Sequence, residues 1–208
     1  LILVGQGALV GGAGVLELAA QLAVAVGAVG DEGETWSGFA VLHTAAARVG
    51  ALDLGFVPGP GGKTVAQMVE PGALDVVFLL GADEIEVPPG AFVVYQGSHG
   101  DRGAHRADVI LPGAAYPERA GTWVNTEGRV QFGIRAVFPP GEAREDWAIL
   151  RALSDVLGHK LPYDTLAQLR SALYAQYPHF ADPEILAPAD PDAIRALAKR
   201  SGGAVPTG

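Results

Sequence analysis

Three short apolar runs constrain the fold more than any other feature of this 208-residue sequence. They are Val76–Leu80 (VVFLL), Phe92–Tyr95 (FVVY) and Val109–Leu111 (VIL), and none of them alternates with charged residues. Such runs are typical of strands buried on both faces of a parallel sheet. The segments between them are about a dozen residues long, which is enough for crossover connections. We therefore expect an α/β fold with an open, mostly parallel sheet flanked by helices.

The regions on either side add further elements. Leu1–Val4 (LILV) predicts a strand that leads through a Gly-rich turn into a helix from about Gly14 to Gly27. Trp36–Val49 has apolar residues at helical spacing (Phe39, Leu42 and Ala46) and predicts a second helix, with His43 as a packed or capping residue. Alternating residues around Asn125–Gly128 predict a hairpin.

The last part of the sequence is expected to be helical. Glu145–Leu157 has one apolar face, and Thr165 with Gln168 forms a capping box for a helix that Pro178 ends. Asp190–Pro191 begins a short helix that ends near Gly202, after the Pro-rich segment His179–Ala189. We expect three parts: an α/β segment (1–140), a helical extension packed on it (141–178), and a Pro-rich linker with a short terminal helix (179–208).

The net charge of the sequence indicates which classes of partner it can bind. The formal net charge is -9 and the pI about 4.9. Nucleic-acid binding depends on Lys and Arg that release counterions from phosphate. The five Arg between residues 98 and 135 are offset by the acidic residues Asp101, Asp108, Glu118 and Glu127. We therefore expect no nucleic-acid partner.

The sequence contains no cysteine, which excludes disulfides, thiolate zinc sites and cysteine-held iron–sulfur clusters within these residues. The apolar stretch Leu18–Gly30 is shorter than a membrane span, and no signal peptide is recognisable. We expect no direct membrane span, so any membrane association comes through partner proteins. Because the sequence begins with a fully apolar strand and no Met, we expect it to be a fragment of a longer polypeptide.

Two Gly-rich turns invite a nucleotide-binding interpretation. Gly5-Gln6-Gly7 partly matches a dinucleotide fingerprint, but Val10 stands where the third glycine belongs, which favours a simple strand-to-helix turn. Leu54–Lys63 (LGFVPGPGGK) is expected to be loop. With Thr64 it imitates a P-loop, but Pro58 occupies the position of its first glycine.

Polar residues concentrate in Phe92–Gln131, where any specific chemistry is expected. The loop Gly97–Asp108 follows a predicted strand, where open parallel sheets bind ligands, and it carries His99, Asp101, Arg102, His105, Arg106 and Asp108. Two His six residues apart match no zinc spacing. We favour a structural role, in which Asp101 and Asp108 pair with Arg102 or Arg106 and cap backbone groups. Metal or phosphoryl chemistry is the alternative.

The following segment offers a second candidate. Glu118 and Glu127 are possible acid–base partners, but a hairpin tip is usually solvated and leaves carboxylates unperturbed. No Gly-x-Ser-x-Gly motif and no cysteine nucleophile is present, and no triad context surrounds Ser37, Ser98, Ser154, Ser171 or Ser201. We therefore expect no catalytic, cofactor-binding or metal-ligating residue in this chain.

Several segments resemble one known family. Two of them are ADVILPGAAYPERAGTWVNTEGRVQ (107–131) and PPGEAREDWAILRALSDVLGHKLPYDT (139–165). They resemble the C-terminal region of the large peripheral-arm subunit of NADH:quinone oxidoreductase, respiratory complex I. Three earlier segments resemble it too, in the right order: FAVLHTAAARVGALDLGFVPG, LLGADE and VYQGSHGDRGAHRADVILPGAAY. The likeness therefore spans roughly residues 1 to 175. In that family this region has a fold similar to that of molybdopterin oxidoreductases, in which NTEGR followed by Gln also occurs.

The resemblance implies a structural, non-redox segment of an electron-transfer complex. Complex I relatives have lost the molybdenum cofactor, and cysteines near the N-terminus hold their iron–sulfur clusters. The resemblance therefore implies no cofactor in this chain, with iron–sulfur clusters in the missing N-terminal part and FMN in a partner subunit. It also implies other peripheral-arm subunits as partners. The location would be peripheral, on the cytoplasmic side of the bacterial inner membrane or the mitochondrial matrix side.

Two alternatives stay open. One is the tail of an active molybdopterin oxidoreductase of the formate dehydrogenase type, with Gly97–Asp108 and Thr122–Gln131 near a pterin dinucleotide. The other is a free-standing nucleotide-binding module that uses Gly5 and Gly7.

Overall fold

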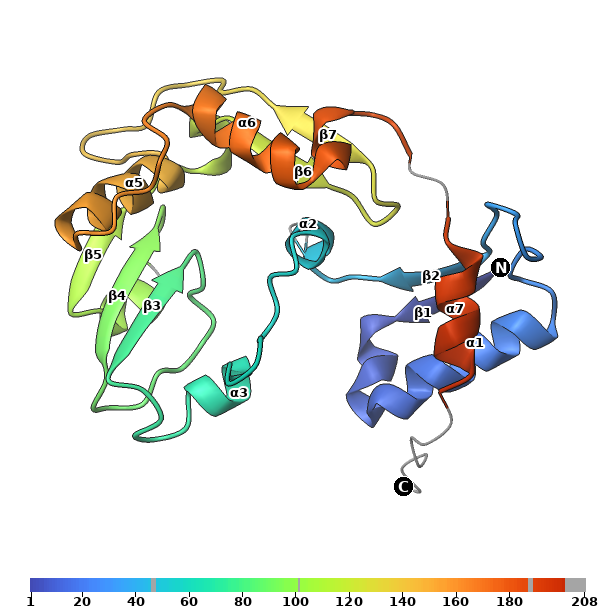
Figure 1. Ribbon diagram of the computed structural model, residues 1–208. Coiled ribbons are helices and arrows are strands. Elements are labelled where there is room, and N and C mark those ends of the chain that lie inside the picture. Colours follow the sequence, from blue (N-terminus) through green and yellow to red (C-terminus); the bar gives the residue numbers. More distant parts are fainter. Residues whose placement is uncertain (46–47, 101, 187–188, 201–208) are drawn as a thin grey trace. The chain divides into compact units, whose positions relative to one another are not determined.

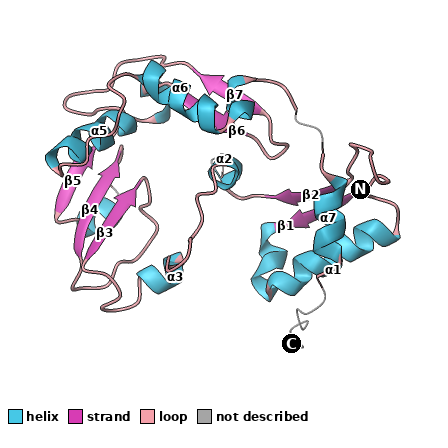
Figure 2. Ribbon diagram, viewed as in Figure 1, coloured by secondary structure: helices cyan, strands magenta, loops and turns pink. Residues whose placement is uncertain are grey.

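The computed structural model describes residues 1–45, 48–100, 102–186 and 189–200 (Figure 1). The chain divides into two compact units. Unit 1 comprises residues 1–55, 123–131 and 179–208, and unit 2 comprises residues 56–122 and 132–178. Figure 2 shows that both combine helices and strands. The predicted α/β class is confirmed, whereas the expected division at residues 140 and 178 stays a prediction.

Unit 2 contains the three predicted parallel strands. They are β3 (Val76–Leu80), β4 (Phe92–Gly97) and β5 (Val109–Pro112), with β4 in the centre. Phe78 lies beside Val94, which lies beside Val109, and both strand pairs are parallel. The prediction from the three apolar runs is therefore confirmed.

One face of this sheet carries the core of unit 2. Leu79, Val93 and Tyr95 point to it and pack with Val87. Val87 comes from the link between β3 and β4, which is irregular because Pro88 and Pro89 prevent a continuous helix. The link between β4 and β5 forms the short helix α4 (Arg102–Arg106), whose Ala104 packs on the same face. Both crossovers therefore cover one side of the sheet.

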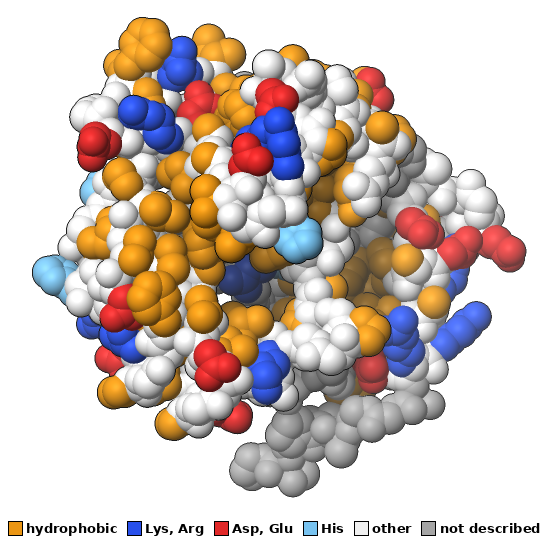
Figure 3. Space-filling view, turned by 60° about the vertical axis from the view of Figure 1, so that its left-hand side comes forward, with side chains coloured by type: hydrophobic (Ala, Val, Ile, Leu, Met, Phe, Trp, Pro, Cys, Tyr) orange, Lys and Arg blue, Asp and Glu red, His pale blue; other side chains and the backbone are white. Residues whose placement is uncertain are grey.

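The other face of the sheet is mostly apolar and remains largely exposed along β3. Val76, Phe78 and Leu80 are 58%, 37% and 50% exposed. Burial on both faces, expected from the apolar runs, is thus found for one face, whereas the second is buried only in part, at Gln96. Figure 3 shows hydrophobic side chains spread over much of the face that it presents, between isolated charged groups.

Helical elements make up most of the rest of unit 2, and one of them has the cap that the sequence predicts. These elements are α3 (Val65–Met68), a short 3₁₀ turn η2 (Tyr116–Glu118), α5 (Asp146–Val156) and α6 (Leu166–Gln176). Thr165 and Gln168 form the predicted capping box of α6. Thr64, which imitated the last residue of a P-loop, instead caps α3 together with Gln67. The predicted hairpin consists of β6 (Gly121–Val124) and β7 (Val130–Gly133).

Unit 1 is built on the parallel pair β1 (Ile2–Gly5) and β2 (Phe39–Leu42). A 3₁₀ segment η1 (Gln6–Gly11) leads into α1 (Ala13–Ala25), so the turn interpretation of the first glycines agrees with the structure. Gly27 ends this region with a φ of 67°, a left-handed conformation that favours glycine.

The predicted helix over Trp36–Val49 is wrong. Phe39–Leu42 is the strand β2, and helix α2 begins only at Arg48 (Arg48–Asp53). Ala46, the third residue of the predicted stripe, lies outside the described residues. Four apolar residues in a row fit either structure, and pairing with β1 decided for the strand.

The C-terminal part of unit 1 consists of a 3₁₀ turn η3 (Pro178–Ala181) and helix α7 (Pro191–Ala198), which packs on α1. Asp190 caps α7 and Pro191 is its first residue, as predicted. The predicted end near Gly202 lies outside the described residues. Throughout the described ranges, each helix falls short of the length and apolarity that a membrane crossing requires.

Candidate functional site

The loop after β4 is tied to the Tyr95 ring. The Tyr95 hydroxyl donates to the carbonyl oxygen of His99 at 3.1 Å. A Cβ built on Gly97 would lie 2.3 Å from the Tyr95 hydroxyl oxygen, and one on Gly103 would lie 2.8 Å from the ring. Both positions therefore need glycine for close approach. His99 itself is exposed and lies 2.9 Å from the Ser98 hydroxyl through Nδ1, while Asp101 lies outside the described residues.

Arg106 holds the backbone of the preceding crossover. Its Nε donates to the Val87 carbonyl at 3.2 Å, and its Nη2 donates to the carbonyls of Pro88 and Ala91 at 3.2 and 3.0 Å. A guanidinium has a fixed fork of donors, so three carbonyls bound at once fix its orientation. The segment before β4 is thus fastened to the helix before β5.

Asp108 has a matching role. Its Oδ2 accepts a hydrogen bond from the Val93 amide at 2.7 Å and lies 3.7 Å from Nη1 of Arg106. The predicted structural role, with Asp108 paired to an Arg and capping a backbone group, is confirmed for this pair. Arg102 and His105 are exposed on α4.

Gln96 marks a contact that sequence reasoning missed. It is fully buried at the carboxyl end of β4, and its Nε2 donates to Oδ1 of Asp146 at 2.9 Å and to the Asp146 carbonyl at 3.3 Å. Asp146 also forms an ion pair with Arg119. The start of α5 is therefore fastened to the sheet. A polar residue directly after the apolar run FVVY was the available signal.

The two candidate acid–base carboxylates have separate local partners. Glu118 accepts a hydrogen bond from the Ala115 amide at 2.8 Å. Glu127 lies at the hairpin tip, with its side chain 63% exposed and 3.7 Å from Arg129. Asn125 closes the tip, because its Oδ1 accepts from the amides of Glu127 and Arg129, each at 3.0 Å. Each carboxylate thus interacts with a nearby group of the chain itself, which favours a structural role for both.

A cavity of about 310 Å³ lies within unit 1, where the hairpin tip faces the segment after β2. His43 lines it, and the buried Nδ1 of His43 has no hydrogen-bond partner among the described residues. The neighbouring Thr44 donates to Oε1 of Gln6 through both its amide and its hydroxyl, at 2.9 and 2.6 Å. Gln6 of the Gly-Gln-Gly turn is thereby used to hold the chain after β2.

The serines found without triad context have local roles. Ser37 accepts from the Phe39 amide, Ser154 donates to the Arg151 carbonyl and Ser171 to the Ala167 carbonyl. Ser201 lies outside the described residues. In the described part of the chain, the structure brings together no group of three or more His, Asp or Glu side chains suited to hold a metal ion.

Comparison with known proteins gives one consistent answer. Residues 1–156 match the molybdopterin oxidoreductase family. The 78 kDa subunit of mitochondrial NADH-ubiquinone oxidoreductase from Neurospora crassa is 50% identical over 170 residues, which are 80% of this chain and 22% of that protein. The corresponding subunit of Candida albicans is 51% identical over 156 residues, 74% of this chain and 21% of that protein.

A third relative is the 75 kDa subunit of NADH-ubiquinone oxidoreductase from Reclinomonas americana. It is 49% identical over 148 residues, 69% of this chain and 21% of that protein. The chain thus spans about a fifth of the length of these curated relatives. The resemblance seen in the sequence is confirmed, and the chain belongs to the molybdopterin oxidoreductase family, in the part of it that the 75 and 78 kDa subunits of NADH-ubiquinone oxidoreductase represent.

Proposed function

We propose that this chain is a structural, non-redox segment of the large iron–sulfur subunit of NADH-ubiquinone oxidoreductase. In that role it supports electron transfer from NADH to quinone in the assembly and carries no electrons itself. The relatives named above support the choice of complex. The lack of cysteine supports the non-redox role, because these residues offer no thiolate for an iron–sulfur cluster.

One observation carries the proposal. Several of the polar side chains that made Phe92–Gln131 a candidate site bind the chain's own backbone. Arg106 holds three carbonyls, Asp108 holds the Val93 amide, and Asn125 closes the hairpin tip. Donors and acceptors used in this way fix the backbone and are not directed at a substrate. We therefore propose no catalytic, cofactor-binding or metal-ligating residue in this chain.

The proposal places the redox groups elsewhere. Iron–sulfur clusters belong to the part of the subunit before Leu1, and FMN belongs to a partner subunit. The partners of this segment are then the other subunits of the peripheral arm. The location is peripheral, on the cytoplasmic side of the bacterial inner membrane or on the matrix side in mitochondria.

A matched pair of substitutions in the full-length subunit tests this function. Arg106→Met removes the three carbonyl contacts, whereas Arg102→Met removes an exposed Arg from the same helix. Loss of hydrogen bonds from a charged group costs about 1.5–3 kcal/mol each at most, so less assembled complex is expected for Arg106→Met. NADH:quinone activity per assembled complex and the electron paramagnetic resonance signals of the clusters should stay at wild-type values.

The activity per assembled complex distinguishes a structural role of Arg106 from a direct role in electron transfer. A large fall in activity per assembled complex, with normal cluster signals, would mean that Arg106 serves electron transfer directly and would contradict a purely structural role. Arg102→Met should leave both the amount of complex and its activity unchanged.

The alternative is the tail of an active molybdopterin oxidoreductase of the formate dehydrogenase type, which the family match favours. That family implies a pterin dinucleotide. Arg106, Asp108 and Asn125 do not fit as ligands of this pterin dinucleotide, because they bind the chain's own backbone. Molybdenum analysis of the purified full-length protein tests the alternative, since stoichiometric molybdenum would favour it over the structural role.

A further inference from the structure

The end of unit 1 wraps over three distant stretches of the same unit. We call residues 179–186 and 189–198 the strap. At its start, Phe180 is 3% exposed, and Nε2 of His179 lies 3.5 Å from Oδ2 of Asp53 at the end of α2. These residues lie beyond the family match, which ends at residue 156, so the family likeness does not account for the strap.

The middle of the strap binds the hairpin tip through its backbone. The Glu184 amide donates to the Val130 carbonyl at 2.7 Å, and the Glu184 carbonyl accepts a hydrogen bond from Nη1 of Arg129. Glu184 has a φ of 65°, and it is the one non-glycine residue with positive φ in the described ranges. A residue with a Cβ adopts this conformation at an energetic cost, so surrounding contacts must hold it there.

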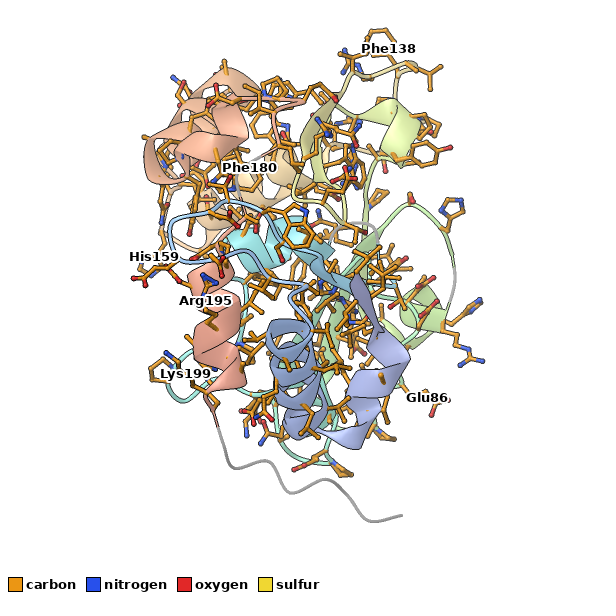
Figure 4. The ribbon with its side chains drawn as sticks, turned by 90° about the vertical axis from the view of Figure 1, so that its right-hand side faces the viewer. Glu86, Phe138, His159, Phe180, Arg195 and Lys199 are labelled. Carbon is orange, nitrogen blue, oxygen red and sulfur yellow. The ribbon has the colours of Figure 1, made fainter. Side chains whose placement is uncertain are left out.

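The end of the strap is anchored on the β1–α1–β2 layer. Ile194 of α7 packs against a small buried cluster of Ala23, Ala28 and Val29. Arg195, labelled on α7 in Figure 4, donates through Nη1 to the Gly30 carbonyl. The Ala189 amide donates to the Thr35 carbonyl at 3.1 Å. Apolar packing and backbone contacts thus both hold this end.

The hairpin tip depends on such outside support. Each strand of the hairpin is four residues long, and an isolated two-stranded hairpin is marginally stable in water. Asn125 closes the turn, but the β7 side of the tip is fixed by Glu184. We propose that docking of α7 on α1 holds the hairpin tip in order, with Glu184 as the clamp between them. The strap is therefore a conformational device that acts on the hairpin tip, whose residues line the 310 Å³ cavity.

Hydrogen exchange of the full chain, read by mass spectrometry, tests the coupling. Ile194→Asp puts a carboxylate into the apolar contact of α7 with α1, and Ala196→Asp puts the same group on an exposed position of α7. If the strap orders the hairpin, Ile194→Asp speeds exchange in residues 123–131 about tenfold, since local opening sets exchange rates. Ala196→Asp should change it by less than about twofold. Faster exchange confined to α7 and α1 would overturn the proposal.

A second variant acts in the opposite direction. Glu184→Gly keeps both backbone contacts and relieves the positive φ, so exchange in residues 123–131 should slow about threefold. Unchanged or faster exchange there would count against the clamp. Residues 76–97 of unit 2 are the internal reference. If Ile194→Asp also speeds their exchange, that variant has lost its fold, and the Glu184→Gly result decides alone.

Discussion

Replacing Gly103 by alanine tests whether the Tyr95 ring is packed against α4 as tightly as the structure shows. The new Cβ would lie 2.8 and 2.9 Å from two ring carbons of Tyr95 and 3.2 Å from the Asp83 Cα. Tyr95 is 3% exposed and its hydroxyl is bound to the His99 carbonyl, so the ring has little room to move. Overpacking of this kind costs about 1–3 kcal/mol.

Helix propensity acts against this cost. Gly103 lies within α4, and alanine gains about 1 kcal/mol over glycine in a helix interior. Because the contacts are with a buried ring and with backbone, we expect the clash to exceed this gain. Gly103→Ala should then lower the free energy of unfolding by up to about 2 kcal/mol. Urea denaturation followed by far-ultraviolet circular dichroism gives the value.

Two further variants isolate the ring contact. Gly100→Ala is the matched control, because among the described residues no atom beyond its chain neighbours lies within 4 Å of its built Cβ, and it should be neutral or slightly stabilising. In a Tyr95→Leu background the ring carbons are gone, so Gly103→Ala should become neutral or stabilising by up to about 1 kcal/mol. Equal effects of Gly103→Ala with and without the ring would refute the packing argument.

Two more predictions concern the helical part of unit 2. The hydrogen bond from Arg151 holds the pKa of Asp164 below 3.8, so the pair's contribution to stability is complete above the unfolded pKa and is lost as pH falls through the folded pKa. Arg151→Met should raise the midpoint of the Asp164 titration measured by nuclear magnetic resonance, and an unmoved midpoint would disprove this origin of the shift. Thr165→Ala removes half of the capping box and should cost about 1 kcal/mol in urea denaturation, whereas Ser171→Ala should cost much less.

Local signals in the sequence were sufficient to predict much of the secondary structure of unit 2. Three apolar runs predicted three parallel strands, and the length of the segments between them predicted crossover connections. Thr165 and Gln168 predicted a helix start that the structure confirms. Each of these signals acts within a few residues, because side-chain periodicity and capping depend on the nearest neighbours. The family resemblance likewise followed from contiguous segments.

Contacts between residues far apart in the sequence could not be predicted from those local signals. Phe39–Leu42 suits a helix by its spacing, and only pairing with β1, more than thirty residues earlier, makes it a strand. Gln96 is buried because Asp146, fifty residues later, binds its amide. The same limit applies to Asp108, since the sequence suggested a capping role but not that the amide it binds belongs to Val93.

The sequence by itself determined the α/β class, the strands of the central sheet and the absence of cysteine ligands, because composition and local periodicity are properties of the chain alone. The tertiary structure decided what the polar residues of Phe92–Gln131 do. In a folded chain, backbone groups that leave water need partners, and Arg106, Asp108 and Asn125 are the partners that lie within reach. It also decided that residues after 178 return to unit 1 as the strap, where Glu184 meets Val130 across the fold.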